Sequence, residues 1–384
     1  MVKDLKMDWS LFLIATGLSL FGTMMVYSAS AMIAHRETAG ATQFTYFYKQ
    51  LLFTMVGIAV MFAASRIDYR RYQNPYVIGG VIAVALVGLF AVFFFSPING
   101  AQRWIRVGSF SVQPSEIAKI AVPLFLAYFL ARNENRVGEI KATVIPCLGM
   151  VTLFSVLIML QPDLGTTMVI GVIFAAIYFT AGANLLHIAA VGIVMVTAAG
   201  AAVLLAPWRV QRMTAFLDPF AHADDAGYQV VQSLYAIGSG GIFGEGFARG
   251  QAKLFYLPYP YSDFIFSVVG EELGLIGTLG IVIAFAFLLW RGARAALKAP
   301  DRFGMLLGIG LITSIVVQAL FNISVVISIV PAKGIPLPFI SYGGTSVLVT
   351  LFAIGILLNI SKHAGSADKP AGNVHRQKGR MRAK

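Results

Sequence analysis

The chain has 384 residues, of which 58% are hydrophobic and only 12% charged, and its mean hydropathy is +0.78. An ordinary soluble domain does not carry so much apolar sequence, so the composition excludes a soluble fold and indicates an integral membrane protein. The net charge of +12 would suit nucleic acid in a soluble protein, but no aromatic and basic surface module is present, and we expect no nucleic-acid partner.

Ten apolar runs follow one another, each close to the length of about 20 residues that a membrane helix needs. A small-residue segment, Ala29-Ser30-Ala31, resembles a signal-peptidase site, but the first run is longer than a signal core and many runs follow, so we interpret it as a membrane helix. The sequence therefore predicts an all-α, polytopic membrane domain over residues 1–362. The predicted spans are 9–27, 46–65, 76–96, 115–131, 143–160, 165–182, 184–205, 265–290, 303–330 and 341–361.

The distribution of charge predicts the orientation. Ten spans place both termini on one side, and the segments on that side carry most of the Lys and Arg residues, which predicts cytoplasmic termini in a bacterial cytoplasmic (inner) membrane. The basic tail, 363–384, is expected to be disordered. The long segment 206–264, between spans seven and eight, is then extracytoplasmic, and Tyr228–Ile237 within it is expected to form an interfacial helix.

Basic residues also remain on the outer side, where the orientation rule predicts few. A basic outer surface suits an anionic ligand, and phosphate is the natural candidate. Snorkelling at helix ends is the alternative for any single residue. The outer basic residues are Arg36, Lys49, Arg103, Arg106, Lys119, Arg209, Arg212, Arg249, Lys253 and Lys333.

Polar residues also occur where the fourth and sixth spans begin. Glu116 and Lys119 are three residues apart, so they form an intrahelical pair or leave Lys119 facing a phosphate-binding cavity. They follow Gln113-Pro114-Ser115, a typical helix start. Asp163 lies in the tight connection before span six, where we expect it to cap the helix.

Asp263 is the strongest candidate for catalysis. It follows a Tyr- and Pro-rich run and precedes a strongly apolar helix, a place where a carboxylate is costly to hold near lipid. Capping of that helix by Ser262 or Asp263 is the structural alternative. A partly desolvated aspartate would have a raised pKa and could accept a proton from a hydroxyl group.

Glu271 and Glu272 follow about two turns into the same helix. Glu271 is eight residues beyond Asp263, so the two are expected on roughly one helix face. Adjacent carboxylates at membrane depth cannot both face lipid, which predicts either a buried ion pair with a basic residue on another span or a proton relay for transport.

Two glycine-rich segments complete the pattern. Residues 238–246 lack the preceding strand and the lysine of a nucleotide-binding loop, so we expect a flexible loop whose backbone N–H groups approach a substrate. Residues 331–346, which contain Lys333 and Ser341, are dense in Pro and Gly. Such broken backbone at membrane depth requires surrounding protein or a polar cavity, which favours an active or transport site.

Together these motifs resemble the SEDS family of bacterial cell-wall proteins, the group that contains FtsW, RodA and SpoVE. Each motif alone is weak, but their joint occurrence in this order is highly specific. Lys333 within Pro331-Ala332-Lys333-Gly334 looks more like the division and sporulation branch than the elongation branch. The matching segments are 100–105, 113–119, 161–166, 227–233, 262–274 and 333–344.

The resemblance implies a ten-span peptidoglycan glycosyltransferase that polymerises lipid II, a disaccharide on a polyprenyl pyrophosphate, during septal wall synthesis. The family's essential aspartate matches Asp263, and the implied partners are a class B penicillin-binding protein transpeptidase and other divisome membrane proteins. A lipid II flippase and a non-catalytic divisome scaffold are the alternatives.

The residues are assigned roles on that basis. Asp263 is the catalytic candidate, in a single displacement that inverts the anomeric carbon. No cofactor is certain, a divalent cation (Mg²⁺ or Mn²⁺) is left open, and no metal ligands are assigned. The substrate-binding candidates are Arg103, Lys119, Glu116, Arg209, Arg212, Lys333 and Ser341, and the residues left as structural or uncertain are Gln113, Asp163, Glu271 and Glu272.

Overall fold

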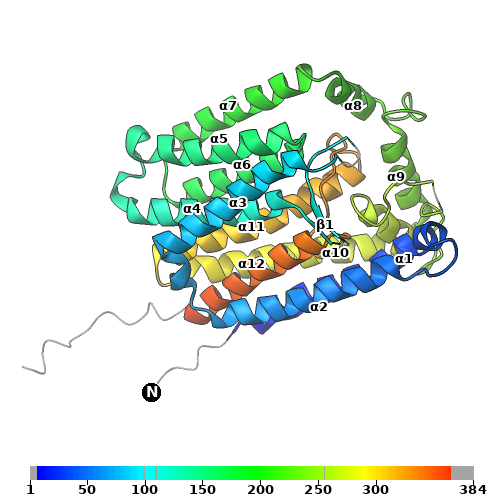
Figure 1. Ribbon diagram of the computed structural model, residues 1–384, viewed down its shortest axis with the longest axis horizontal. Helices are drawn as coiled ribbons and strands as arrows, with labels where there is room; N and C mark the ends of the chain where they lie inside the picture. The colour runs from blue at the N-terminus through cyan, green and yellow to red at the C-terminus, as the bar shows by residue number, and fades with distance from the viewer. Residues whose placement is uncertain (1–6, 98–99, 109, 255, 365–384) are drawn as a thin grey trace, which may run out of the picture.

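The computed structural model describes residues 7–97, 100–108, 110–254 and 256–364, and it is a bundle of helices with one small hairpin (Figure 1). The hairpin pairs β1 (Ile105–Val107) with β2 (Phe110–Val112) in antiparallel register. The α-helices are α1 (Trp9–Glu37), α2 (Thr45–Arg66), α3 (Pro75–Ala91), α4 (Pro114–Arg132), α5 (Ile145–Leu160), α6 (Leu164–Thr180), α7 (Leu185–Leu204), α8 (Pro207–Leu217), α9 (Tyr228–Ser239), α10 (Ile265–Leu297), α11 (Arg302–Val326) and α12 (Gly344–His363). Short 3₁₀ turns (Tyr69–Gln73, Val92–Phe94, Glu134–Arg136) and a π-helical turn (Ile140–Val144) join them.

The predicted polytopic, all-α fold is confirmed. Within the described part of the chain, eight helices are long and apolar enough to cross a membrane. The shorter apolar helix α6 and the helix α7 occupy the two remaining predicted spans. The first span is longer than expected, because α1 continues through the buried Ser28, Ala29 and Ser30 to Glu37.

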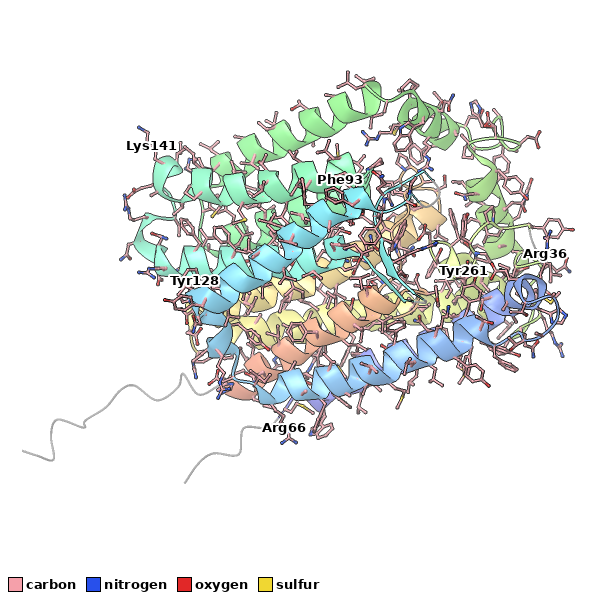
Figure 2. All side chains as sticks on the ribbon, in the orientation of Figure 1. Arg36, Arg66, Phe93, Tyr128, Lys141 and Tyr261 are labelled. Atoms are coloured by element: carbon pink, nitrogen blue, oxygen red, sulfur yellow. The ribbon has the colours of Figure 1, made fainter. Side chains whose placement is uncertain are left out.

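Alternating helices carry the chain between two ends of the bundle. Figure 2 shows Arg66, Tyr128 and Lys141 at one end and Arg36 and Tyr261 at the other. The described chain begins and ends at the first of these, which we call the terminal end (Figure 1). The opposite end, the loop end, carries the hairpin, α8, α9 and the loop before α12. The two termini therefore lie together, as an even number of spans requires.

Two long helices differ in how they are buried. The helix α11 packs against α4, α6, α10 and α12, and 72% of the residues in its most apolar stretch are buried. By contrast, α7 packs mainly against α6 and α8 at the edge of the bundle, and its Ile193, Val194 and Val196 are exposed. In a membrane protein such an apolar edge faces lipid.

The helix α10 is kinked at Gly274, whose φ of 64° lies in the left-handed region. The segment 240–246 supplies the hydrogen bonds that the kink removes. Glu245 and Gly246 donate to the carbonyls of Glu271 (2.9 Å) and Glu272 (3.0 Å), and the N–H groups of residues 275 and 276 donate back to residues 241 and 242. A Cβ at Gly274 would lie 2.5 Å from the Gly244 nitrogen, so only glycine fits. The glycine-rich segment therefore holds α10, and the expectation that these N–H groups approach a substrate is wrong.

A helix over Tyr228–Ile237 is confirmed, as α9, and it buries one side against the bundle. Tyr235 is 59% exposed, whereas Val230 and Ser233 are buried with Val231. The Ser233 and Ser267 hydroxyls are 2.7 Å apart, and Ser233 also donates to the Val326 carbonyl. These bonds turn α9 so that it packs on α10 and α11.

Candidate active site

Asp263 lies at the loop end, in the turn that leads into α10. The N-cap of α10 is Phe264, which makes no side-chain capping bond, so neither Ser262 nor Asp263 caps this helix. The backbone of Asp263 is instead fixed from α11. The Asn322 side chain donates from Nδ2 to the carbonyl of Asp263 and to that of Ile335, both at 2.7 Å. The main chain of Asp263 is therefore fixed, and its half-buried carboxylate does not cap a helix.

Gly334 allows a cation to approach this carboxylate. A Cβ built on Gly334 would lie 3.0 Å from Asp263 Oδ2 and 3.6 Å from an Arg103 guanidinium nitrogen. The pKa of Asp263 is raised to about 6, mainly by burial and also by the negative charge of Asp163, against the opposing positive charges of Arg103 and Arg212. The carboxylate is therefore ionised at neutral pH and yet basic enough to accept a proton.

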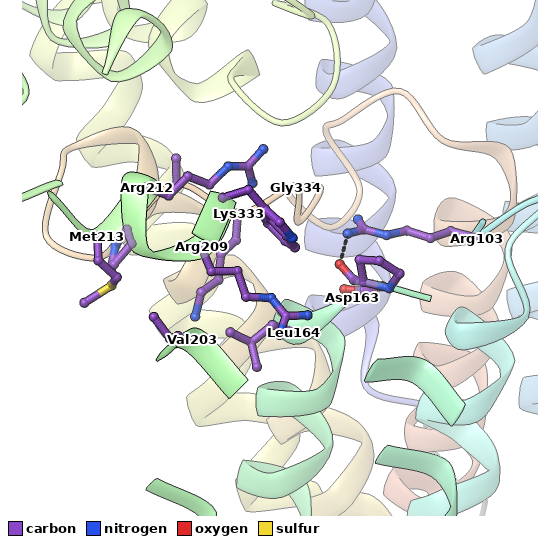
Figure 3. Close-up of a pocket in the computed structure, with 14 residues that line it drawn as sticks. Arg103, Asp163, Leu164, Val203, Arg209, Arg212, Met213, Lys333 and Gly334 are labelled. Atoms are coloured by element: carbon purple, nitrogen blue, oxygen red, sulfur yellow. Dashed lines mark hydrogen bonds between the residues drawn. The ribbon is translucent and has the colours of Figure 1, made fainter. Parts of the chain in front are cut away.

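Several basic side chains line a cavity at Gly334 (Figure 3). It encloses about 460 Å³ of space, counting its open mouth. Its walls come from the loop before β1, the connection between α5 and α6, helix α8 and the loop after α11. We call it the cationic cavity, and its lining includes Arg103, Asp163, Trp208, Arg209, Arg212, Lys333 and Gly334.

The basic residues of the cationic cavity are held in different ways. Arg103 donates to the carbonyls of Gln161 (3.2 Å) and Pro162. On α8, the guanidinium carbons of Arg209 and Arg212 lie 4.9 and 5.3 Å from the centre of the Trp208 ring. Burial lowers the pKa of Lys333, and the charge of Arg209 lowers it further. An anion in the cavity would relieve this mutual repulsion.

Two further predicted residues support the site, Asp163 in the lining of the cationic cavity and Ser341 outside it. Asp163 caps α6 as expected, since its Oδ1 accepts from the Thr166 N–H (3.1 Å) and its Oδ2 from the Thr166 hydroxyl (2.9 Å). Ser341 donates to the carbonyl of Ser262 (2.6 Å) and accepts from the Leu337 N–H (2.7 Å). Ser341 is 2% exposed, so it holds the loop that carries Asp263 and does not face the cavity.

Glu116 and Lys119 lie elsewhere. Lys119 Nζ is 2.8 Å from Glu116 Oε1, so the predicted intrahelical pair is present, and Lys119 also donates to Gln318 on α11. The pair borders a second, smaller cavity between α4, α11 and α12 and does not line the cationic cavity. Gln113, just before α4, donates from Nε2 to the Ser115 hydroxyl (3.0 Å) and contacts Thr345 through its backbone, which is a structural role.

Glu271 and Glu272 hold the loop 240–253. Glu271 accepts the N–H groups of Gln251 (2.6 Å) and Ala252. Glu272 pairs with Lys253 at 2.6 Å and accepts the Ser28 hydroxyl. The predicted ion pair is confirmed for Glu272, although its partner is in the loop and not on another span. The predicted shared face with Asp263 is wrong, because α10 begins two residues after Asp263.

Sequence reasoning missed the residues on α11 that connect these features. Gln318 accepts from Lys119 and donates to the Pro336 carbonyl (2.8 Å), and Asn322 joins Asp263 to Ile335. Ser314, Gln318 and Asn322 recur every four residues in an apolar helix, which places them on one face. That spacing is the signal that could have identified them.

This arrangement suits a reaction in which a hydroxyl loses a proton while an anionic group departs. Asp263 can take the proton, and Arg103, Arg209, Arg212 and Lys333 can stabilise the anion. In the described residues, no group of three His, Cys, Asp or Glu side chains could hold a metal ion. Asp163 already uses both carboxylate oxygens on Thr166. Within the part of the chain that the structure describes, the side chains alone therefore do not fit a resident metal, and no step is assigned to one.

Comparison with known proteins gives relatives along nearly the whole chain. A family model described as "Cell cycle protein" (FTSW_RODA_SPOVE) matches residues 8–366. The chain is 40% identical to stage V sporulation protein E of Bacillus subtilis, covering 94% of this chain and 99% of that protein. It is 38% identical to the probable peptidoglycan glycosyltransferase FtsW of Geobacter sulfurreducens, covering 94% and 96%.

Two solved structures share the fold. The chain superposes with a TM-score of 0.74 on a chain from the structure described as "Structural coordination of polymerization and crosslinking by a peptidoglycan synthase complex", at 24% identity over 94% of this chain and 98% of that one. With the rod shape determining protein RodA of Thermus thermophilus the TM-score is 0.67, at 25% identity over the same shares.

Proposed function

The chain belongs to the FtsW, RodA and SpoVE family, and from this we propose that it is a peptidoglycan glycosyltransferase that polymerises lipid II into glycan strands during septal wall synthesis. The observation that carries the proposal is the Asp263 carboxylate, which caps no helix, has a raised pKa and adjoins the cationic cavity. The division and sporulation names of the relatives agree with the branch that Lys333 indicates.

In this mechanism Asp263 is the general base. A sugar hydroxyl attacks the anomeric carbon of the donor and passes its proton to the Asp263 carboxylate. A new C–O bond forms, the bond from that carbon to the diphosphate oxygen breaks, and the carbon is inverted in a single displacement. Polyprenyl diphosphate leaves with the bonding electrons.

The cationic cavity is the place for the departing diphosphate. Arg103, Arg209, Arg212 and Lys333 would offset the charge that grows on the leaving oxygen. Arginine presents paired donors that match phosphate oxygens, and stacking on Trp208 limits the freedom of two of these guanidinium groups. The support for this assignment is the gathering of four basic residues from three segments around one opening.

The setting of the enzyme is part of the proposal. We infer that the chain lies in the bacterial inner membrane with its terminal end in the cytoplasm and Asp263 outside. The basic residues Arg66, Arg70, Arg132 and Arg294 lie on segments of the terminal end, which agrees with the positive-inside rule. A class B penicillin-binding protein is the proposed partner, together with other divisome membrane proteins. A divalent cation that arrives with the diphosphate remains a prediction that a chelator tests.

The alternative functions have less support from the contacts. A transporter needs charged groups free to exchange protons inside the membrane, whereas Glu271 and Glu272 are bonded to the loop 240–253. A scaffold needs no carboxylate with a raised pKa beside a cationic cavity.

Replacement of Asp263 by asparagine tests the proposal, since the amide keeps the shape and cannot act as a base. Purified protein reconstituted with lipid II should lose about 10²- to 10⁴-fold of its polymerisation rate. Asp224→Asn, an exposed change in the same long loop, is the matched control and should polymerise normally. Glycan strands made by the Asp263→Asn protein at the wild-type rate would end the catalytic assignment.

A further inference from the structure

Three tyrosines from distant parts of the chain meet at the loop end. Tyr46 is in the first turn of α2, Tyr261 lies in the loop before α10, and Tyr342 lies just before α12. Their ring centres are 4.7 Å (Tyr46 to Tyr261), 5.1 Å (Tyr46 to Tyr342) and 5.7 Å (Tyr261 to Tyr342) apart. All three side chains are half-buried, so each keeps some surface open. We call these residues the tyrosine cluster.

The tyrosine cluster is fixed relative to Asp263. Tyr261 precedes Asp263 by two residues, and its carbonyl accepts the Tyr342 N–H at 2.9 Å. The Ser341 hydroxyl bonds the carbonyl of the intervening Ser262. From α2, Gln50 donates to the Ser341 carbonyl (3.2 Å). These bonds join all three segments, so the rings and the carboxylate form one preorganised unit.

The tyrosine cluster differs from the cationic cavity in charge. The negative charge of Asp263 acts on Tyr261, and a second carboxylate, Glu37, accepts the Tyr46 hydroxyl at 2.7 Å. A diphosphate is repelled by that carboxylate and attracted to the cavity of Arg103 and Lys333. Tyrosine rings offer apolar faces edged with hydroxyl groups, which suits a neutral ligand that carries both C–H faces and hydroxyls, such as a sugar ring.

Joining two saccharides requires two binding regions, one for the donor and one for the acceptor, with the base between them. Resting on the function proposed above, we propose that the tyrosine cluster is the subsite for the neutral acceptor saccharide, which it presents to Asp263 while the donor diphosphate occupies the cationic cavity. The polar edge supplied by Glu37 and the tyrosine hydroxyls would fix the orientation of the attacking hydroxyl.

Membrane anchoring is the competing explanation, because tyrosines gather at membrane surfaces. Tyr48 provides the matched control. It lies two residues after Tyr46 in the same turn of α2, it is 62% exposed, and its ring packs on Phe44 and Phe47 and not on the tyrosine cluster. Replacing Tyr48 therefore removes a surface aromatic at the same level without changing the cluster.

The test uses the full chain in nanodiscs and a soluble, lipid-free and uncharged disaccharide of N-acetylhexosamine units. Saturation-transfer NMR measures binding to wild type and to Tyr46→Leu, Tyr342→Leu and Tyr48→Leu. Leucine keeps apolar volume and removes the ring, so we expect about fivefold weaker binding in the first two variants, which is about 1 kcal/mol, and no change in Tyr48→Leu. Added polyprenyl diphosphate should leave the saccharide bound.

Phenylalanine variants keep the test decisive if a leucine variant fails to fold. Tyr46→Phe and Tyr342→Phe retain the rings and should bind the saccharide within about twofold of wild type. Wild-type binding in the Tyr46→Leu and Tyr342→Leu proteins, displacement of the saccharide by polyprenyl diphosphate, or equal losses in Tyr48→Leu would each overturn the proposal.

The outcome is separable from that of the proposed function. If Asp263→Asn polymerises lipid II normally, the catalytic assignment fails whatever the tyrosine variants do. If Asp263→Asn is inactive but the leucine variants bind saccharide and polymerise like wild type, only the subsite fails. Leucine variants with normal binding that lose stimulation by a transpeptidase would assign the cluster to partner contact and overturn the subsite.

Discussion

Removing the charge of Arg103 should change the pH at which the enzyme works. A Cβ built on Gly334 would lie 3.6 Å from an Arg103 nitrogen and 3.0 Å from Asp263 Oδ2. The nitrogen and the oxygen are therefore at most about 6.6 Å apart, the sum of the two distances. The pKa of Asp263 is about 6 because burial raises it and the positive charge of Arg103 holds part of that rise back. In Arg103→Gln that opposition is lost, so the pKa should rise and less of the base should be ionised at neutral pH.

Coulomb's law gives the size of the effect. Unit charges about 6.6 Å apart at an effective dielectric constant of about 20 interact by about 2.5 kcal/mol, or nearly 2 pKa units. Screening by salt and water reduces this, so we expect a rise of about one to two pH units. The low-pH limb of the activity profile should therefore move from about pH 6 to about pH 7–8.

The assay is the initial rate of lipid II polymerisation between about pH 5 and pH 9, expressed as kcat/KM, which reports the pKa of the free enzyme. Arg106→Gln is the control, since it removes one positive charge from an exposed position on β1. Arg103 also contributes to the cationic cavity, so its loss should lower the plateau of the profile as well, and the position of the limb is the quantity to compare.

Two results would refute this reasoning. The first is an Arg103→Gln profile whose low-pH limb stays at the wild-type position or moves to lower pH. The second is an equal movement in Arg106→Gln, which would show that net charge and not the neighbouring guanidinium sets the pKa of Asp263.

Three further predictions follow from individual contacts. Asn322→Leu removes two 2.7 Å bonds, so kcat for polymerisation should fall about 10- to 100-fold with KM nearly unchanged, and an unchanged kcat would show that the bond to Asp263 is not needed. Lys253→Met leaves the buried carboxylate of Glu272 without its cation and should lower the free energy of unfolding by about 3–5 kcal/mol, measured by thermal unfolding. The double variant with Glu272→Gln should recover part of that stability. Equal stability of the single and double variants would count against the ion pair. Gly334→Ala places a methyl group 3.0 Å from Asp263 Oδ2 and should lower kcat about tenfold, whereas Gly149→Ala, with no atom near its Cβ position, should have wild-type kinetics.

The membrane helices could be predicted because each one corresponds to a continuous apolar run in the sequence. Asp263 could be identified for the same reason, since its unusual position between a Tyr- and Pro-rich loop and an apolar helix is visible within a few residues. That Asp163 caps α6 was also predictable, because a cap depends on the next three residues.

Features that depend on distant segments could not be predicted. The kink at Gly274 exists because residues 240–246 bond to both sides of it, and a single glycine in an apolar helix carries no such information. The sequence leaves open whether Lys119 pairs with Glu116 or faces a phosphate-binding cavity, because its side chain also contacts Gln318 on α11, almost 200 residues later. The same is true of Asn322, whose partners are in two different loops.

The absence of a capping bond from Asp263 has a practical consequence. Because Phe264 is the N-cap of α10 and the Asn322 amide holds only the main chain of Asp263, the carboxylate makes no capping bond that an amide would lose. An Asp263→Asn protein should therefore keep its native scaffold and still admit both lipid-linked sugars. Such a stalled enzyme is suited to trapping the two reactants side by side for direct visualisation.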